Sequence, residues 1–498
     1  MSFLKDFRCS SCGHRHSPDG YYVVCSRCGG ILHAEYDLDR AQGEISRAEL
    51  ADRRGGLWKY HEVLPILAPD EHVSLGEGNT FLQRGGRLAE QLGMKNLYLK
   101  DETRNPTGSF LDRGISVEIT KAKHIGRTGV SCGSTGNLAA SLVAYAARAG
   151  MESRVFIAQR GSVDIGKFHQ ILAYGAEVEI VANHRNAMEK AAGLSHELHN
   201  IVPYTPFFLE GIKTTAIEVV GQLDWKTPDW MILPMGNGGH LSMSWRGLQE
   251  MEQLGLIDEV TTRLVGVQAA GCAPIVEAFE SGSKRVESVE VQSTVALDIG
   301  VEDPSCGGFA LESLRASGGE AVAVTDDEIL EGVRQLASRE GVFAEPAAAT
   351  TIAALERLLR EGIIHHDDSV VCVITGSGLK YPDITRALVK GRGRLEHLLS
   401  RIEGRGYTTE IGQTKQYILK ILSEGESYGY DIWKTLAERF GVKIKVPSVY
   451  QHLSELRGSG LIVETHSKLS AERRRRNYYD LSDRGKWTLN QLEKMAHE

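Results

Sequence analysis

The chain has 498 residues, which is too long for one ordinary core and suggests about three domains. Its 42% hydrophobic and 24% charged residues are typical of a globular protein and exclude a collagen-like or mainly disordered chain. The net charge of −8 is uneven, because residues 407–498 hold 15 Lys+Arg against 12 Asp+Glu. We therefore expect only the C-terminal part to meet a polyanion.

The start of the chain lacks the apolar stretch of a secretion signal, and no run approaches the roughly 18 apolar residues of a membrane span. We therefore expect a cytoplasmic protein without a membrane partner. The eight cysteines fall as two close pairs and four single residues. This pattern suits metal ligation in a reducing compartment better than a disulfide framework.

Residues 1–40 contain two copies of one short motif, Cys9-Ser-Ser-Cys12-Gly and Cys25-Ser-Arg-Cys28-Gly. The two-residue gap lets both thiolates of a pair face one ion, and the glycine allows the tight turn. Four thiolates complete a closed tetrahedral site, so we predict a structural Zn²⁺ in a zinc ribbon of its own. His14 and His16 are alternative ligands, although a solvated turn is their simpler role.

Residues 57–390 alternate strand-like apolar runs, such as 230–233 and 370–374, with amphipathic helical stretches. This alternation predicts an α/β fold with mainly parallel strands. Ser134-Thr-Gly-Asn137 precedes a helical stretch, where free backbone amides favour a carboxylate. In Gly236-Asn-Gly-Gly239 the missing side chains let successive amides approach a phosphate.

Two loops carry a family resemblance. Asn105-Pro-Thr-Gly-Ser-Phe-Leu-Asp-Arg-Gly114 and Leu75-Gly-Glu-Gly-Asn-Thr-Phe-Leu82 resemble active-site loops of threonine synthases, pyridoxal-phosphate enzymes of fold type II with a tryptophan-synthase-β-like core. Phe81 replaces the proline that the family usually has. The resemblance implies that Ser134 and Thr135 hold a substrate carboxylate, and it implies cofactor contacts at Asn137, Gly236, Asn237, Gly238, Gly239 and Thr375, with Ser377 as a second candidate beside Thr375.

One position departs from that family. Leu111 occupies the place of the lysine whose amine forms a Schiff base with the cofactor aldehyde and then shuttles protons. A leucine can do neither, so any pyridoxal 5′-phosphate would be held non-covalently. The rescue of this function by Lys100 or Lys380 is not expected, because reactive geometry is set to fractions of an ångström. Lys167 and Arg113 are candidate contacts for a substrate phosphate.

The last part of the chain begins after a linker at 391–413 rich in glycine and charge. Residues 414–498 predict three short helices and a basic hairpin, which is a winged helix. The motifs Ser427-Tyr-Gly-Tyr, Pro447-Ser-Val-Tyr450 and Gly460-Leu-Ile resemble PadR-type transcriptional regulators. The likeness implies base contacts by Ser448, Tyr450 and Gln451 and phosphate contacts by Arg473, Arg474, Arg475 and Arg476.

The leading hypothesis is a catalytically impaired, threonine-synthase-like protein that binds pyridoxal phosphate or an amino-acid ligand and regulates binding to double-stranded DNA. An amphipathic stretch from Lys486 to His497 favours a homodimer. One alternative is a threonine synthase that converts O-phosphohomoserine to threonine and phosphate, with a regulatory C-terminal domain, if Leu111 is engineered or another lysine serves. A weaker alternative is a related replacement enzyme that acts on another phospho-amino acid.

Overall fold

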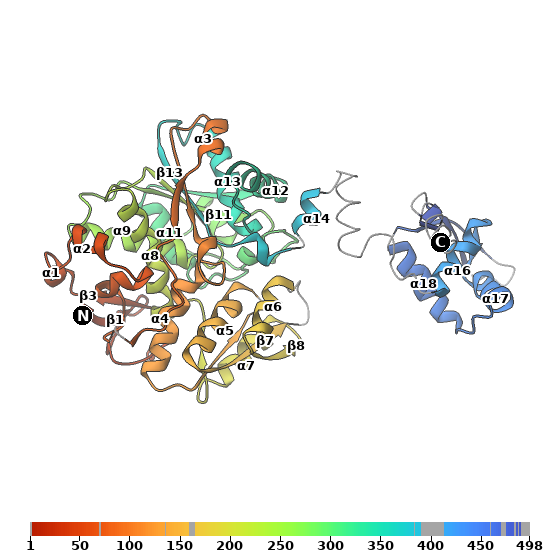
Figure 1. The fold of residues 1–498 in the computed structure, drawn as a ribbon, viewed down its shortest axis with the longest axis horizontal. Coiled ribbons are helices and arrows are strands. Elements are labelled where there is room, and N and C mark those ends of the chain that lie inside the picture. The colour runs from red at the N-terminus through yellow and green to blue at the C-terminus, as the bar shows by residue number, and fades with distance from the viewer. Residues whose placement is uncertain are drawn as a thin grey trace. The chain divides into compact units, whose positions relative to one another are not determined.

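The computed structural model describes residues 2–68, 71–134, 136–158, 165–382, 384–389, 413–458, 460–469, 475–482, 485–486 and 488–489. The chain forms two compact units, Met1–Leu388 and Val389–Glu498 (Figure 1). The expected linker at 391–413 lies outside the described residues except for its last residue, Gln413. Within the described part of the chain, no helix is both long and apolar enough to cross a membrane.

The larger lobe of the first unit is built on a six-stranded sheet. Its strands pair in parallel, apart from the antiparallel edge pair β4–β5. Strands buried on both faces read as continuous apolar runs, which explains why β10 and β13 were recognisable in the sequence. The order is β12 (Glu320–Val324), β11 (Arg263–Ala269), β10 (Trp230–Pro234), β13 (Ser369–Ile374), β5 (Asn96–Asp101) and β4 (Phe81–Arg84).

Helices cover the sheet of the larger lobe. The long helix α8 begins at Pro206, whose fixed φ suits the first turn, after the N-cap Thr205. Apolar residues of α13 pack against β10, β11 and β13 in one core cluster, and α8 and α9 contribute to a second. The helices are α3 (Gly86–Leu92), α8 (Pro206–Gln222), α9 (Gly239–Gln253), α10 (Pro274–Glu280), α11 (Gly307–Ala316), α12 (Asp326–Gln335), α13 (Pro346–Arg360) and α14 (Ile384–Val389).

The smaller lobe contains a four-stranded parallel sheet with its own core, and Figure 1 shows α5, α6 and α7 gathered around β7 and β8. Its strands, in spatial order, are β8 (Glu177–Val181), β7 (Glu152–Ala158), β6 (Gly129–Gly133) and β9 (His199–Asn200). The helices are α5 (Asn137–Ala149), α6 (Ile165–Ala173) and α7 (His184–Gly193), and α4 (Leu111–His124) packs against α5. The predicted α/β fold is confirmed, with its strands divided between two lobes.

The N-terminal residues form a three-stranded antiparallel sheet in the order β2 (Arg15–His16), β1 (Leu4–Cys9) and β3 (Leu32–Tyr36). Phe7 is fully buried, and its ring centroid lies 5.1 Å from that of Phe207 on α8. Val117 of α4 joins the same apolar cluster. Residues 1–40 therefore pack into the first unit, whereas the sequence pattern predicted a module of their own.

Short elements complete the first unit and position several loops. They are α1 (Leu38–Ala41), α2 (Arg47–Asp52), η1 (Gly56–Val63), η3 (Glu102–Arg104), η4 (Leu297–Ile299), η5 (Leu336–Glu340) and η6 (Gly378–Lys380). Among these, η4 lines the cavity described below. A capping box at Ser46 and Glu49 fixes the start of α2.

The second unit has the predicted winged-helix architecture. Its three helices are α16 (Gln413–Ser423), α17 (Gly429–Phe440) and α18 (Val446–Gly458), and its strands pair in the order β14 (Ser427–Tyr428), β16 (Arg475–Leu481) and β15 (Ile462–Leu469). Apolar residues from all three helices and from the sheet share one core. This core leaves much of α18 exposed, including Tyr450 and Gln451.

Candidate functional site

The first unit contains a cavity of about 660 Å³ lined by both lobes. Gly133, Pro234 and Thr375 lie at or directly beyond the carboxyl ends of β6, β10 and β13, and all three line it. Ligands of open α/β sheets bind in this place, because the loops that leave the strands there are free to vary. The cavity is therefore the candidate ligand site.

The fold brings most of the sequence-predicted site residues to this one cavity, although they come from distant loops. Thr135 lies outside the described residues, and Ser377, Arg113 and Lys167 do not line the wall. The predicted residues that do line it are Leu111, Ser134, Asn137, Gly236, Asn237, Gly238, Gly239 and Thr375.

The glycine loop leads into the N-terminus of α9. Gly238 has φ = +86°, a conformation that favours glycine, and a Cβ on it would lie 2.9 Å from the Cys306 carbonyl oxygen. The first backbone N–H groups of a helix have no partner within the helix, so they can bind an anion. His240, the second residue of α9, is 6% exposed, and its Nδ1 has no hydrogen-bond partner among the described residues.

Asn137 and Glu345 form a buried polar pair in the cavity wall. The Asn137 Nδ2 donates to both carboxylate oxygens of Glu345, at 2.9 and 3.1 Å, while its Oδ1 has no partner in the described part of the chain. A Cβ on Gly376 would overlap the Glu345 carboxylate, so the glycine leaves room for this side chain in its present position. Burial, together with the nearby Asp298, raises the pKa of Glu345 to about 7.

Leu111 is the first residue of α4 and lines the cavity. Its side chain is half-buried and packs against the apolar core of the smaller lobe. The preceding ring, Phe110, stacks on His240 with centroids 4.2 Å apart and planes 10° apart. An aliphatic side chain thus faces the cavity, in a wall that contains both apolar side chains and polar groups such as Asn137 and Glu345.

Three lysines lie near this region, and none of them lines the cavity. The Lys100 Nζ donates to Glu218 at 2.9 Å and to Gln222 at 2.8 Å. The Lys167 Nζ lies 2.5 Å from Asp298. The Lys380 Nζ is buried without a hydrogen-bond partner among the described residues, and burial lowers the pKa of this amine.

Arg113 is buried behind the cavity. Its guanidinium donates to Glu102 at 2.7 Å and to Glu218 at 2.8 Å, and it also reaches Thr80 and Thr214. These partners satisfy the planar donor fork of an arginine. The candidate role of Arg113 as a contact for a substrate phosphate was therefore wrong, because its charge is matched by internal carboxylates.

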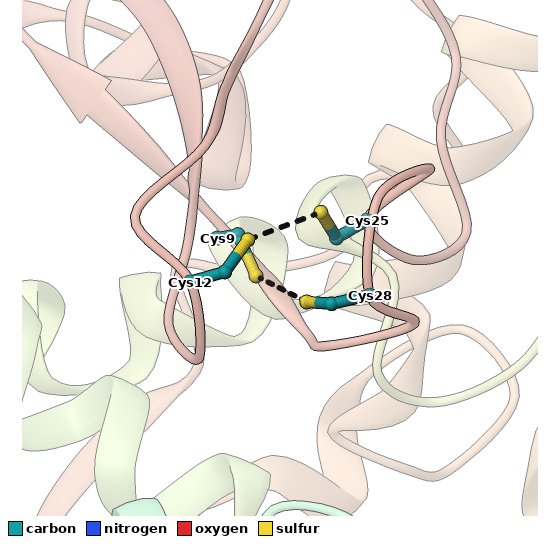
Figure 2. Close-up of side chains that lie close together, drawn as sticks. All are labelled: Cys9, Cys12, Cys25 and Cys28. Carbon is teal, nitrogen blue, oxygen red and sulfur yellow. Dashed lines mark hydrogen bonds between the residues drawn. The ribbon is translucent and has the colours of Figure 1, made fainter.

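The four N-terminal cysteines form a separate cluster in which every pair of sulfur atoms lies within 4.8 Å (Figure 2). Cys9 and Cys28 are 3.5 Å apart at Sγ, and Cys12 and Cys25 are 3.8 Å apart. A tetrahedral ion with bonds of about 2.3 Å requires sulfur atoms about 3.8 Å from one another. The His16 Nε2 lies 3.4 Å from the Cys25 Sγ, as an outer neighbour of the cluster.

The second unit presents a polar helix face and a basic strand. Tyr450 is 47% exposed, Gln451 is exposed and Ser448 is half-buried on α18. Gly429 lacks the Cβ that would collide with the Tyr450 ring. Arg475 and Arg476 begin β16, where the Arg476 guanidinium lies 4.7 Å from the centroid of the Tyr428 ring, whereas Arg473 and Arg474 lie outside the described residues.

Comparison with known proteins finds a matching family model in each of the two units. Residues 73–376 match the family model for pyridoxal-phosphate dependent enzymes, and residues 418–491 match that of the PadR-like transcriptional regulators. A threonine synthase of Methanocaldococcus jannaschii is 43% identical over 379 residues, 76% of this chain and 93% of that protein. A threonine synthase of Methanosarcina acetivorans is 39% identical, covering 75% of this chain and 92% of that protein.

Solved structures support the fold. Threonine deaminase isoform 2 of Solanum lycopersicum superposes with a TM-score of 0.53 at 20% identity, covering 68% of this chain and 96% of that one. A fungal L-serine ammonia-lyase of Rhizomucor miehei superposes with a TM-score of 0.53 at 22% identity, covering 60% of this chain and 93% of that one. The chain thus belongs to the threonine synthase family of pyridoxal-phosphate dependent enzymes, and carries a PadR-like domain at its C-terminal end.

Proposed function

We propose that this protein is a DNA-binding regulator whose cavity holds pyridoxal phosphate and an amino-acid ligand without turning the ligand over efficiently. One observation carries the proposal: Leu111, which by resemblance takes the place of the family's lysine, lines the cavity together with the predicted cofactor-binding residues. The attached PadR-like domain supplies an output for ligand binding that needs no catalysis.

The residues that line the cavity fit the cofactor except at Leu111. The amides of the glycine loop and of α9 suit its phosphate, and Asn137 and Thr375 suit its ring. Two buried atoms in the cavity wall, Asn137 Oδ1 and His240 Nδ1, have no partner among the described residues, as expected where a polar ligand completes the wall. When bound, the cofactor supplies an electron-withdrawing ring and a reactive aldehyde.

Leu111 separates binding from turnover. Its side chain has no nitrogen, so it cannot capture the aldehyde or hold a proton that is being transferred. A positioned general acid or base typically contributes about 10² to 10⁴ in rate. The noncovalent contacts to phosphate and ring are independent of that amine, so a large part of the binding energy is retained.

The loop before α5 accounts for an amino-acid ligand. Ser134 lines the cavity, and α5 begins directly after Gly136, so free N–H groups at the helix start can hold a carboxylate. Thr135 of the same loop is assigned to this role by resemblance. The cysteine cluster holds Zn²⁺ in a closed site, which stabilises the sheet of residues 1–40 and takes no part in chemistry.

The second unit provides contact with DNA. Ser448, Tyr450 and Gln451 on α18 are assigned to base edges in the major groove, and the arginines from 473 to 476 to phosphates. Helix-turn-helix regulators read paired half-sites as dimers, which is the reason for expecting two copies of this chain on one site.

Binding of the intact protein to promoter fragments tests the proposal. We expect the dissociation constant for DNA to change when pyridoxal phosphate with threonine or O-phosphohomoserine is added, and we expect no sustained phosphate release. Indifference of DNA binding to every such ligand would overturn the regulatory role. Steady multiple-cycle phosphate release, abolished by removal of the cofactor, would instead identify a threonine synthase.

A further inference from the structure

A buried ion cluster links the two lobes beside the cavity. The Lys167 Nζ, fully buried on α6, lies 2.5 Å from Asp298 Oδ2 and 3.3 Å from Glu345 Oε1. Lys167 belongs to the smaller lobe, whereas Asp298 lies in η4 and Glu345 directly before α13, both in the larger lobe. One ammonium group therefore pairs with two carboxylates across the boundary between the lobes.

The backbones of the two lobes also meet closely at this point. A Cβ on Gly166, the residue before Lys167, would lie 2.5 Å from the carbonyl oxygen of Lys380 in η6. The Lys167 Nζ also lies 5.8 Å from the centroid of the Tyr381 ring. Any movement of α6 away from the larger lobe would therefore separate Lys167 from Asp298 and Glu345 and break two charge pairs, of which the Lys167–Glu345 pair is buried on both sides, which is costly.

The cluster continues to the cavity through hydrogen bonds. Glu345 and Asp298 both line the cavity wall, and Lys167 stands behind them without lining it. The Asn137 Nδ2 in turn donates to the Glu345 carboxylate and lies 2.9 Å from Oε2 and 3.1 Å from Oε1. The direction in which the unpartnered Asn137 Oδ1 points is thus set by Glu345, whose own position is set by Lys167.

We propose that Lys167 is a positioning residue that couples the contact between the lobes to the orientation of Glu345 and Asn137 in the cavity. The effect on the cofactor rests on the proposed function, while the link between the lobes stands without it. Lys167 acts through the two carboxylates and does not itself touch the ligand.

This arrangement gives ligand binding a defined pH dependence. The groups that face Glu345 are Asp298, which favours its protonated form, and Lys167, Lys380 and the Asn137 amide, which favour its ionised form. The ionised carboxylate accepts the hydrogen bond from the Asn137 amide more strongly than the protonated acid does, so affinity falls when the pH drops through the titration of Glu345 near 7. Removing the Lys167 charge moves this inflection to higher pH.

Three variants separate a positioning role from a general effect on stability. They are Lys167→Met, Lys167→Arg and the control Lys190→Met, in which an exposed lysine of α7 loses its ion pair with Glu179. Pyridoxal-phosphate affinity would be measured by absorbance titration of the full chain from pH 6 to 9. We expect Lys167→Met to weaken affinity about 2- to 30-fold and to shift the inflection upward, with Lys167→Arg close to wild type. An unchanged inflection in a folded Lys167→Met variant would overturn the coupling to Glu345.

Hydrogen exchange of the same proteins without ligand tests the link between the lobes separately. We expect faster amide exchange in α6 and η4 for Lys167→Met, and no change there for Lys190→Met. If the wild type takes up no pyridoxal phosphate but α6 still loosens in Lys167→Met, the proposed function fails while the link between the lobes holds. If Lys167→Met does not fold, Asp298→Asn takes its place, and unchanged exchange in α6 then overturns the link.

Discussion

The cysteine cluster and the cavity differ in completeness. At the cluster, all four donors that a closed metal site requires lie within 4.8 Å of one another. At the cavity, the glycine loop at 236–239, the Asn137 amide and Thr375 line the wall together with Leu111, which by our proposal stands in place of the one group required for covalent chemistry. Under the proposed function, the difference is that the cavity keeps nearly all of its binding groups and loses its reaction, because one nitrogen carries the chemistry.

The largest effect is expected when an amine is introduced at position 111, because this should restore the reaction at the cavity. Leu111→Lys places a primary amine at the start of α4, at the position that the resemblance assigns to the family's Schiff-base lysine. We expect a borohydride-stable pyridoxyl group on residue 111 and an increase of about 10² to 10⁴ in phosphate release from O-phosphohomoserine. Leu111→Met, which restores length without nitrogen, is the control, and equal rates in both variants would contradict the account.

The cluster can be made incomplete in the same way. Cys12→Ser removes one of four donors, and we expect loss of bound zinc and destabilisation of the first unit by several kcal/mol, since structural zinc binds small domains with roughly 10–16 kcal/mol. Metal content and thermal unfolding measure this. Arg27→Ala, an exposed change between Cys25 and Cys28, is the control, and a zinc-free wild type of equal stability would refute the assignment.

The proposed DNA-binding surface of the winged helix gives a third site for comparison. Gln451→Ala on α18 should cost about 1–3 kcal/mol on the specific DNA site, whereas Arg476→Ala should weaken binding to all sequences and lower the salt slope by about one. Fluorescence anisotropy at several salt concentrations separates the two effects. Lys420→Ala on α16 is the control, and identical behaviour of all three variants would exclude α18 as the recognition helix.

The smallest expected effect concerns Asp112, the neighbour of Leu111, and the dependence of protein stability on pH. Burial raises the pKa of Asp112 to about 6, although Ser141 and Thr107 donate hydrogen bonds to it. A raised pKa contributes stability that is full at low pH and is lost as the pH rises through about 6. The unfolding free energy of wild type should therefore fall by about 1 kcal/mol relative to Asp112→Asn between pH 5 and pH 7.5.

Urea unfolding at the two pH values measures this difference. Asp258→Asn, at a fully exposed carboxylate, should show no such change with pH. A difference between wild type and Asp112→Asn that is constant with pH would mean that Asp112 titrates normally.

Much of this site was predictable because its loops carry local signals. The strands read as apolar runs, and the Ser134 and Gly236 loops follow directly after β6 and β10, so each loop lies at the carboxyl edge of its own sheet, where ligand-binding loops are expected. The four cysteines were predictable for the same reason, since the spacing within each pair is a local property.

The remainder depends on contacts that no local pattern encodes. Glu345 pairs with Asn137, which lies 208 residues earlier in the sequence. The only local signal was Pro346, which marks the start of a helix and so a place where the preceding carboxylate could have been noticed. Arg113 was misassigned because residues two apart on a helix point about 200° from each other, so Arg113 faces Glu102 while Leu111 faces the cavity. The N-terminal sheet was expected to stand alone because its contact with Phe207 is equally distant in sequence.

The central claim is tested most directly by reduction of the reconstituted wild-type protein with borohydride, followed by peptide mapping. We expect pyridoxal phosphate to bind reversibly, with no pyridoxyl group on any lysine after reduction. A stable adduct on Lys380 or another lysine near the cavity, together with continuing phosphate release from O-phosphohomoserine, would contradict the account.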